Sequence, residues 1–455
     1  MLGCGRVLHD PCCCSPSQED FSPVVDHPSQ VLTSAVADAE LDRLRPPDEA
    51  RATVLAHARP LGREFVPIAE AAGRVLAEDL VADEDAPPFP AATMDGFAVV
   101  AADGSPWREV IGAQMAGYVA DVEVTPGTAV RITTGAPLPR GADAVVRVEG
   151  TEPAEDHVIV HQEIVSPGEN IRQVGADLRR GSLVLPAGTL LGPAEIGLLA
   201  GLGRNPVPVR ARPRVSVLST GDELVEPGAA IGPGQIRDSN RFSLVAALRG
   251  EGAEVVWSGK APDEKEPLRA LLAERIATSD VVVTSGGVSM GELDLVKALL
   301  GELARVHFRR VFMKPGKPLN FATAGEEGRV LFFGLPGNPV SALVSFELFI
   351  RPALATMAGR IGFDRPQVPV LLAHDTPPTD RIEFQRATVR VAPDGHLVAA
   401  TTGGQASSRL ASFLGANALL VIPPRADAYR AGERVDALLL APPLGPEETR
   451  QTPGP

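Results

Sequence analysis

The residues best suited to chemistry in this 455-residue chain gather in four short loops between Ser219 and Pro318. Each loop follows a run of apolar residues and combines glycine or proline with acids, hydroxyls or lysines. If the apolar runs are parallel strands, their carboxyl ends meet at one edge of a sheet, where open α/β sheets bind ligands. The loops are residues 219–223, the turn that carries Asp263, residues 285–294 and residues 314–318.

The loop at residues 285–294 has the composition of an oxyanion site. Gly286 and Gly287 offer backbone amides, and Ser285 and Ser289 offer hydroxyls, just before a predicted helix. Unpaired amides and the helix dipole favour a phosphate-like group at such a position. The same residues are equally compatible with an ordinary glycine-rich turn from strand to helix.

Acids on three of these loops form a candidate cation site. Glu223, Asp263 and Asp294 would supply carboxylate oxygens to a hard divalent ion such as Mg²⁺, which prefers carboxylates and water. Asp294 has a second interpretation, because an acid near the start of a helix also stabilises the helix dipole.

The sequence KPGKP carries two lysines on a stiff turn. Lys314 and Lys317 are each followed by proline, which limits the entropy lost when both ammonium groups face one anion. The alternative is a surface turn with two solvated lysines. In an acidic chain, beside a Gly-Gly loop, we favour an anion clamp. The following GLPGNPVS ends one predicted strand and starts a helix with Pro339 in its first turn.

The elements that must hold these loops alternate between strand and helix from Arg214 onward. This alternation predicts a parallel, three-layer α/β domain. Shorter strands and turns predict a small β domain before it and a β-barrel-like domain after it. The predicted strands of the α/β domain are 215–220, 254–258, 280–285, 306–313 and 330–334, and its helices are 241–249, 265–277, 293–303 and 340–357. Nearer the N-terminus we expect a strand at 64–67 and a helix at 69–77.

Composition excludes several classes of protein. The formal charge of −14 argues against general nucleic-acid binding. We also expect no membrane span, no signal peptide and a cytoplasmic location. The histidines show no zinc-ligand spacing, and no G-x-S-x-G, Walker or G-x-G-x-x-G motif occurs. All four cysteines lie in the first 14 residues, so no thiolate nucleophile is expected in the body; they are Cys4, Cys12, Cys13 and Cys14.

Several motifs together resemble one known family. TMDGFA, TTGAPLP, GENIRQVGADL, LSTGDEL, TSGGVSMGELD, MKPGKP and GLPGNPVS occur in this order between about Leu41 and Leu440. The chain is thereby similar to the MoeA/gephyrin E-domain family, the molybdopterin molybdenumtransferases. The resemblance implies a multidomain α/β plus β fold. Its expected parts are a disordered leader (1–30), an elongated linker and dimerisation domain (31–90 with 161–210), an inserted small β domain (91–160), a three-layer α/β molybdopterin-binding domain (211–360), a C-terminal β-barrel-like domain (361–445) and a loose tail (446–455).

The resemblance also implies an activity. In that family molybdate and adenylylated molybdopterin are the substrates, Mg²⁺ assists, and cleavage of the phosphoanhydride releases AMP with the molybdenum cofactor. A homodimer is implied, with each active cleft shared between subunits, and the molybdopterin adenylyltransferase and molybdoenzyme acceptors are candidate partners.

Site residues carry over by matching motif positions. The resemblance implies catalytic roles for Asp95, which faces the cleft from the partner subunit, and for Glu223, Asp263, Asp294, Lys314 and Lys317. It implies substrate contacts from Thr134, Asp177, Ser285, Gly286, Gly287, Ser289, Arg310, Pro336, Pro339, Ser341 and Ser407 or its neighbour Ser408. Arg310 stands where lysine is common in the family, and Phe97 stands where tyrosine is common.

Two rival functions remain. The SGG…D domain is shared with MogA-type molybdopterin adenylyltransferases, which make the adenylylated intermediate. A catalytically silent scaffold is the second rival, because the gephyrin E-domain also anchors partners. The additional domains and the KPGKP and GLPGNP motifs favour metal insertion.

Overall fold

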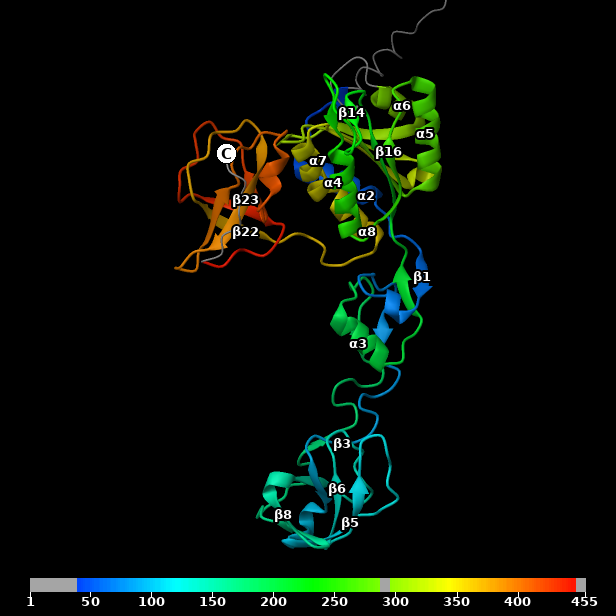
Figure 1. Ribbon diagram of the computed structural model, residues 1–455, viewed down its shortest axis with the longest axis vertical. Coiled ribbons are helices and arrows are strands. Elements are labelled where there is room, and N and C mark those ends of the chain that lie inside the picture. Colours follow the sequence, from blue (N-terminus) through cyan, green and yellow to red (C-terminus); the bar gives the residue numbers. More distant parts are fainter. Residues whose placement is uncertain (1–38, 287–294, 447–455) are drawn as a thin grey trace, which may run out of the picture.

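A computed structural model of the chain describes residues 39–286 and 295–446. In Figure 1 an α/β domain and a β-barrel lie side by side at one end of an elongated molecule. A small linking domain follows, and a small β domain occupies the far end. The predicted leader (1–30) and most of the predicted tail lie outside the described residues.

The α/β domain is built on one six-stranded sheet with the order β16-β13-β17-β21-β20-β18. The first four strands are parallel, and the last two run antiparallel to their neighbours. The bounds are β13 (Arg214–Ser219), β16 (Glu254–Lys260), β17 (Val281–Ser285), β18 (Ala304–Arg310), β20 (Pro318–Ala324) and β21 (Val330–Leu335). Every residue of β17 and β21 is buried, as expected for strands covered on both faces.

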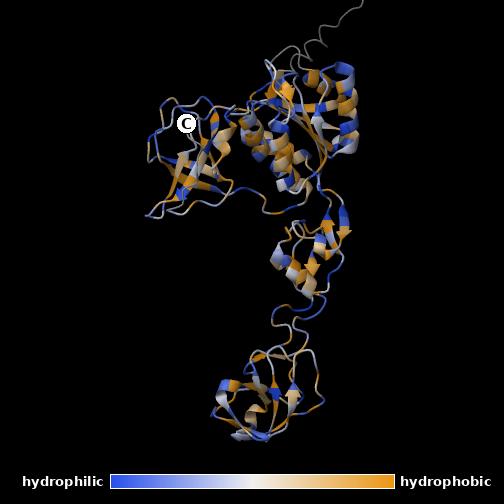
Figure 2. Ribbon diagram, in the orientation of Figure 1, coloured by the Kyte–Doolittle hydropathy of each residue, from blue (hydrophilic) through white to orange (hydrophobic). Residues whose placement is uncertain are grey.

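Helices cover both faces of this sheet, which makes the predicted three layers. One face packs against α2 (Pro47–His57), α4 (Asn240–Gly250) and the continuous helix formed by α7 (Pro339–Ser345), the π-helical turn η5 (Phe346–Ile350) and α8 (Arg351–Met357). The other face packs against α5 (Lys265–Thr278) and α6 (Leu295–Leu303). Figure 2 shows hydrophobic residues along the strands and hydrophilic residues on the outward side of the helices.

The helix Pro339–Met357 is long and apolar enough to cross a membrane by length and composition alone. However, 78% of its apolar window is buried inside the protein. Its residues belong to the larger of the two cores that flank the sheet, so burial in this domain accounts for its composition.

The C-terminal domain is a closed barrel of five strands. Its strands are β22 (Gln367–Leu372), β23 (Ile382–Val391), β24 (Leu397–Thr401), β25 (Ala418–Ile422) and β26 (Arg434–Leu439). Pairing of β23 with β25 closes the ring. A short strand of the α/β domain, β19 (Met313–Lys314), pairs in parallel with the start of β23, so the KPGKP turn begins on the barrel sheet.

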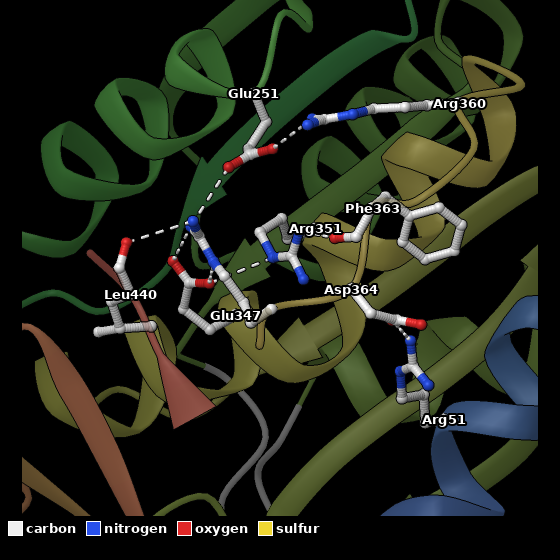
Figure 3. A network of polar contacts seen from close by, with 9 residues as sticks. Arg51, Glu251, Glu347, Arg351, Arg360, Phe363, Asp364 and Leu440 are labelled. Carbon is white, nitrogen blue, oxygen red and sulfur yellow. Dashed lines mark hydrogen bonds and ion pairs between the residues drawn. The ribbon is translucent and has the colours of Figure 1, made fainter. Parts of the chain in front are cut away.

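A second connection runs through the linker between these two domains. Figure 3 shows a group of arginines and glutamates around this linker. Arg365 contacts Glu347 at 3.2 Å and Glu251 at 3.4 Å, both in the α/β domain. It also donates a hydrogen bond to the Leu440 carbonyl at the end of the barrel. One guanidinium therefore joins the two domains.

The linking domain contains α3 (Pro193–Gly201) and two-stranded sheets. They pair β1 (Arg63–Val66) with β12 (Val207–Arg210) and β2 (Leu80–Val81) with β11 (Leu183–Leu185). The short pair of β3 (Ala91–Ala92) and β10 (Ile171–Arg172) lies at the far domain (Figure 1), where Ala92 and Ile171 pack in its core. The far domain is a six-stranded sheet of β4 (Gly96–Val99), β5 (Trp107–Gln114), β6 (Thr128–Ile132), β7 (Ala144–Arg147), β8 (Thr151–Ala154) and β9 (His157–Val160).

Two sequence predictions of local structure were wrong. The helix expected at 69–77 is only a single 3₁₀ turn, Ile68–Glu70. Gly73 has a φ of +75°, and Val75 and Leu76 form bridges with Leu190 and Val209 instead of continuing a helix. The prediction also omitted β20, which starts at a proline and makes the end of the sheet antiparallel rather than parallel.

Candidate active site

A cavity of about 340 Å³ lies at the carboxyl edge of the parallel strands. Its lining comes from the ends of β13, β17 and β21, from the starts of α4 and α7, and from one serine of the barrel. Among the predicted site residues, Glu223, Ser285, Gly286, Pro339 and Ser408 line it. The further lining residues are Thr220, Leu224, Ile236, Arg237, Asp238, Ser239, Asn240, Gly337 and Asn338.

Gly286 is required where two loops meet at this cavity. Its φ is +89°, and a Cβ at this position would lie 2.6 Å from the Thr220 carbonyl oxygen. The amide of Gly286 donates to the Leu335 carbonyl, and the amide of Thr220 donates to the Ser285 carbonyl. The backbone at the end of three strands is therefore held in one arrangement by hydrogen bonds.

Asn240 ties the same loops together from α4. Its side-chain amide donates to Ser285 Oγ at 2.8 Å and to the Gly337 carbonyl at 2.8 Å. Its Oδ1 is buried without a hydrogen-bond partner among the described residues. The sequence prediction did not include Asn240, although it stands within the conspicuous sequence IRDSNRFSL.

Beside Asn240 an ion pair fixes the start of α4. Asp238 is 4% exposed and accepts from Arg241 Nε at 2.9 Å. Arg241 also contacts Glu226 at 2.6 Å. A buried acid paired in this way orients the helix start that forms one wall of the cavity.

The predicted acid Asp263 interacts with a second acid, Asp222, which was not among the predicted site residues. Desolvation raises the pKa of Asp263, and repulsion by Asp222 and a hydrogen bond with Asp222 raise it further, while Lys260 opposes the shift and Glu223 adds to it. Two interacting carboxylates match the protein ligands with which Mg²⁺ is typically held, together with water and substrate phosphates. Among the described residues no group of three or more acids, histidines or cysteines is placed to hold a metal ion.

The two lysines of KPGKP have different surroundings. Lys314 Nζ contacts Glu383 at 3.3 Å, and this glutamate of the barrel is only 7% exposed. Lys317 is half-buried, has no ion-pair partner among the described residues, and accepts at its carbonyl from the Val311 amide at 2.9 Å. Neither lysine belongs to the residues that line the cavity.

The remaining residues predicted near this cavity have mainly structural contacts. Pro336 and Ser341 are buried at the end of β21 and in α7. The carbonyl of Ser407 accepts from the Val340 amide at 3.1 Å, which joins the barrel to the start of α7. Arg310 ends β18, and its carbonyl accepts from the Arg45 amide at 3.2 Å. Predicted residues Gly287, Ser289 and Asp294 lie outside the described residues.

The predicted residues of the small β domain lie far from this cavity in the same chain (Figure 1). Asp95 Oδ1 accepts from the amide of Thr134 at 2.7 Å and from its hydroxyl at 2.8 Å. These two hydrogen bonds lower the pKa of Asp95. Asp177 instead forms an ion pair with Arg172. Asp95 and Thr134 therefore form one exposed unit, and Asp177 with Arg172 forms a separate one.

Comparison with known proteins places the chain. Three family models match in order: the MoeA N-terminal region (domain I and II) at residues 45–203, a probable molybdopterin binding domain at 216–356, and the MoeA C-terminal region (domain IV) at 370–440. The molybdopterin molybdenumtransferase of Haemophilus influenzae is 36% identical, over 85% of this chain and 96% of its own length. The molybdopterin molybdenumtransferase 2 of Mycobacterium tuberculosis is 40% identical, over 81% of this chain and 93% of its own.

A solved structure agrees with these matches. The molybdopterin biosynthesis MoeA protein from Pyrococcus horikoshii OT3 superimposes with a TM-score of 0.74 at 32% identity, and the match covers 87% of this chain and all of that one. Both the order of the matched regions and the backbone agree along nearly the whole described chain. The chain belongs to the MoeA family, whose relatives above are named molybdopterin molybdenumtransferase.

Proposed function

We propose that the protein inserts molybdenum from molybdate into adenylylated molybdopterin and releases AMP. The observation that carries this proposal is the match to relatives named molybdopterin molybdenumtransferase over 81–85% of the chain. The match includes both the α/β domain with its cavity and the small β domain with Asp95 and Thr134. The protein is a transferase of molybdenum cofactor biosynthesis.

Some residues at the carboxyl edge would bind the substrates, and others would neutralise their negative charge. Ser285 lies at the cavity wall, where its hydroxyl would donate to phosphate oxygens of adenylylated molybdopterin, whereas the amide of Gly286 is already bonded to the Leu335 carbonyl. Lys317 would neutralise oxyanion charge, because it is half-buried and has no carboxylate partner among the described residues. Preorganised positive charge of this kind stabilises charge that develops in a transition state. The proposed bond cleavage is that of the phosphoanhydride that joins AMP to molybdopterin.

Mg²⁺ fits the carboxylates beside the cavity. Asp263 and Asp222 would hold the ion, with Glu223 near them, and the predicted third ligand Asp294 lies outside the described residues. When bound, Mg²⁺ would supply charge neutralisation at the phosphate oxygens. The raised pKa of Asp263 supports this assignment. Asp222 and Asp263 repel each other when both are ionised, and a bound cation would relieve that repulsion.

We further propose that the active form is a cytoplasmic homodimer with shared clefts. Asp95 and Thr134 are exposed and preorganised, yet the linking domain separates them from the cavity of their own chain. A second copy would bring the pair of one subunit to the cavity of the other. The test is a mixture of Asp95→Asn and Lys317→Ala subunits, each inactive alone. Recovery of about a quarter of the activity is expected for random pairing, and no recovery would contradict a shared cleft.

A single-turnover assay tests the activity itself. Purified protein is mixed with adenylylated molybdopterin, molybdate and Mg²⁺, and AMP release is followed together with protein-bound molybdenum. We expect both products, and we expect both to require molybdate. Consumption of ATP without molybdate would identify an adenylyltransferase, and binding of the intermediate with no AMP release would identify a scaffold.

A further inference from the structure

A second and larger cavity, of about 540 Å³, lies at the opposite edge of the α/β sheet. It is bordered by the start of β18, by the end of β20 and by the residues that follow α2. Thr323 and Ala324 pair with Leu331 and Val330 at the start of β21, whereas the candidate active site lies beyond the end of that strand. The two cavities are therefore separated by the length of the sheet.

Two arginines and two glutamates line this second cavity. Arg59 and Arg305 line it, and neither has a hydrogen-bond or ion-pair partner among the described residues. The two carboxylates of the lining are already neutralised from outside. Glu302 contacts Lys265 at 3.0 Å and Arg269 at 3.5 Å, and Glu327 contacts Arg329 at 2.8 Å. The lining thus holds two arginines without ion-pair partners and two glutamates that are each paired with cations outside the lining.

Two imidazoles in contact, tilted against each other, also line the cavity. The rings of His57 and His307 have centroids 4.1 Å apart at an angle of 47°. His57 Nδ1 lies 2.9 Å from the Thr53 carbonyl oxygen, so this nitrogen carries the proton. His307 Nε2 lies 3.0 Å from Thr323 Oγ1. These contacts fix both rings, so that the cavity is lined by ring faces and by nitrogen-bearing edges.

The pKa of His307 reflects its burial and the arginines near this cavity. Burial, the largest cause, acts together with His57, Arg305 and Arg45 to lower the pKa of His307 to about 4. The two arginines are cations, so an imidazolium at this position would be disfavoured by positive charge as well as by burial. An anion in the cavity would relieve that repulsion.

We propose that this cavity binds a small molecule that carries a phosphate group. The planar guanidinium groups of Arg59 and Arg305 match pairs of phosphate oxygens, and neither group is engaged in an ion pair among the described residues. The volume exceeds that of a phosphate group alone and falls within the range of ordinary small-molecule sites. The imidazole pair offers a surface on which an organic part of the ligand can stack. This inference does not depend on the proposed molybdenum insertion.

Calorimetric titration of the full chain tests the site, with inorganic phosphate, pyrophosphate and AMP as separate probes. The double variant Arg59→Ala/Arg305→Ala should weaken binding of at least one probe by about tenfold or more. The matched control Arg249→Ala/Arg434→Ala removes the same charge from two exposed positions elsewhere and should leave that binding unchanged. Equal affinity in the first variant and in the unaltered protein would overturn the proposal, as would absence of binding by all three probes.

Two further measurements separate this site from the candidate active site. The ring-proton resonances of His57 and His307 should shift on addition of the probe, and Lys317→Ala should preserve both the shift and the affinity. Tighter binding of AMP than of inorganic phosphate would identify a ligand whose organic part contributes, and equal binding would identify free phosphate as sufficient. Loss of the arginine-dependent binding in Lys317→Ala would contradict a separate site. This conclusion would hold whether or not the protein inserts molybdenum.

Discussion

The two edges of the α/β sheet carry opposite chemistry. At the carboxyl edge the cavity is lined by backbone amides, hydroxyls and Glu223, with the Asp222–Asp263 pair beside it. At the opposite edge the cavity is lined by two guanidinium groups without ion-pair partners, two imidazoles and two glutamates that are paired with cations outside it. The first cavity collects loops from three parallel strands. The second exists because β20 and β18 return antiparallel and bring their ends next to α2.

This difference separates two kinds of experimental effect. Substitutions of the acids and of Lys317 at the carboxyl edge should reduce turnover while leaving the fold intact, because Glu223 and Asp263 are exposed and Lys317 is half-buried. Substitutions at the opposite edge should change anion binding or pH-dependent stability and leave turnover nearly unchanged. The predictions below test this separation.

The largest effect on turnover is expected from Lys317→Ala. Loss of the half-buried ammonium group leaves oxyanion charge without its proposed partner, and the rate of AMP release should fall by about 100-fold or more. Single-turnover kinetics measure this rate. Arg249→Ala, which removes one exposed positive charge from the end of α4, is the control and should retain normal turnover. A normal rate in Lys317→Ala would remove this lysine from the mechanism.

A smaller loss, about tenfold to 100-fold, is expected from Asp263→Asn. The substitution removes one of the two interacting carboxylates, so more Mg²⁺ should be needed to reach half-maximal rate. Glu254→Gln, an exposed acid on β16 of the same domain, is the matched control. An unchanged Mg²⁺ requirement would contradict the assignment of this acid to the ion.

The pH dependence of this requirement sharpens the test. Because burial and Asp222 raise the pKa of Asp263, its carboxylate becomes protonated at a higher pH than an ordinary aspartate as the pH falls. Mg²⁺ binding should weaken over the same interval. Asp222→Asn removes a source of repulsion, so the midpoint of this loss should move to lower pH. A midpoint that stays fixed would show that the two carboxylates are not coupled.

A several-fold effect is expected from Arg365→Ala, which tests whether the carboxyl edge depends on the barrel. The variant loses contacts with Glu347, Glu251 and the Leu440 carbonyl that join the two domains (Figure 3). Ser407 and Ser408 should then be held less firmly at the start of α7, and kcat/KM should fall by about fivefold. Arg360→Ala is the control, because this residue has only a 4.0 Å contact with Glu251 in the same group. Equal effects of the two substitutions would argue against a role for the barrel connection.

The sequence predicts where the carboxyl edge of the α/β sheet lies better than it predicts the contacts between the residues there. Apolar runs followed by Gly-rich or acidic loops predict parallel strands and place Glu223, Ser285 and Gly286 together. The contact of Gly286 with Thr220 depends on the register of β13 and β17, in which Ser219 lies opposite Ser285. Such a register is set by packing over many residues, so a local pattern does not reveal it.

The second edge was not predicted at all. It requires β20, which local pattern reasoning omitted, and it requires a histidine at the end of α2 to lie against His307, 250 residues later in the chain. Neither histidine has ligand spacing in the sequence. Only the antiparallel return of the last two strands brings these residues together, and long-range pairing of this kind is what sequence periodicity cannot supply.

The smallest effect on turnover is expected from His307→Gln, which should instead change stability with pH. Burial and nearby cations lower the pKa of His307 from its usual 6.5 to about 4, so the folded protein binds fewer protons than the unfolded chain between these values. Stability should therefore fall as the pH falls through this window. Glutamine keeps a hydrogen-bonding group near Thr323 and does not titrate, so the variant should lose this component. Denaturant unfolding at pH 7 and pH 4.5 measures it. Because the residue lies at the opposite edge from the candidate active site, the rate of AMP release at pH 7 should stay normal; a large loss would show that the two edges are coupled through the sheet.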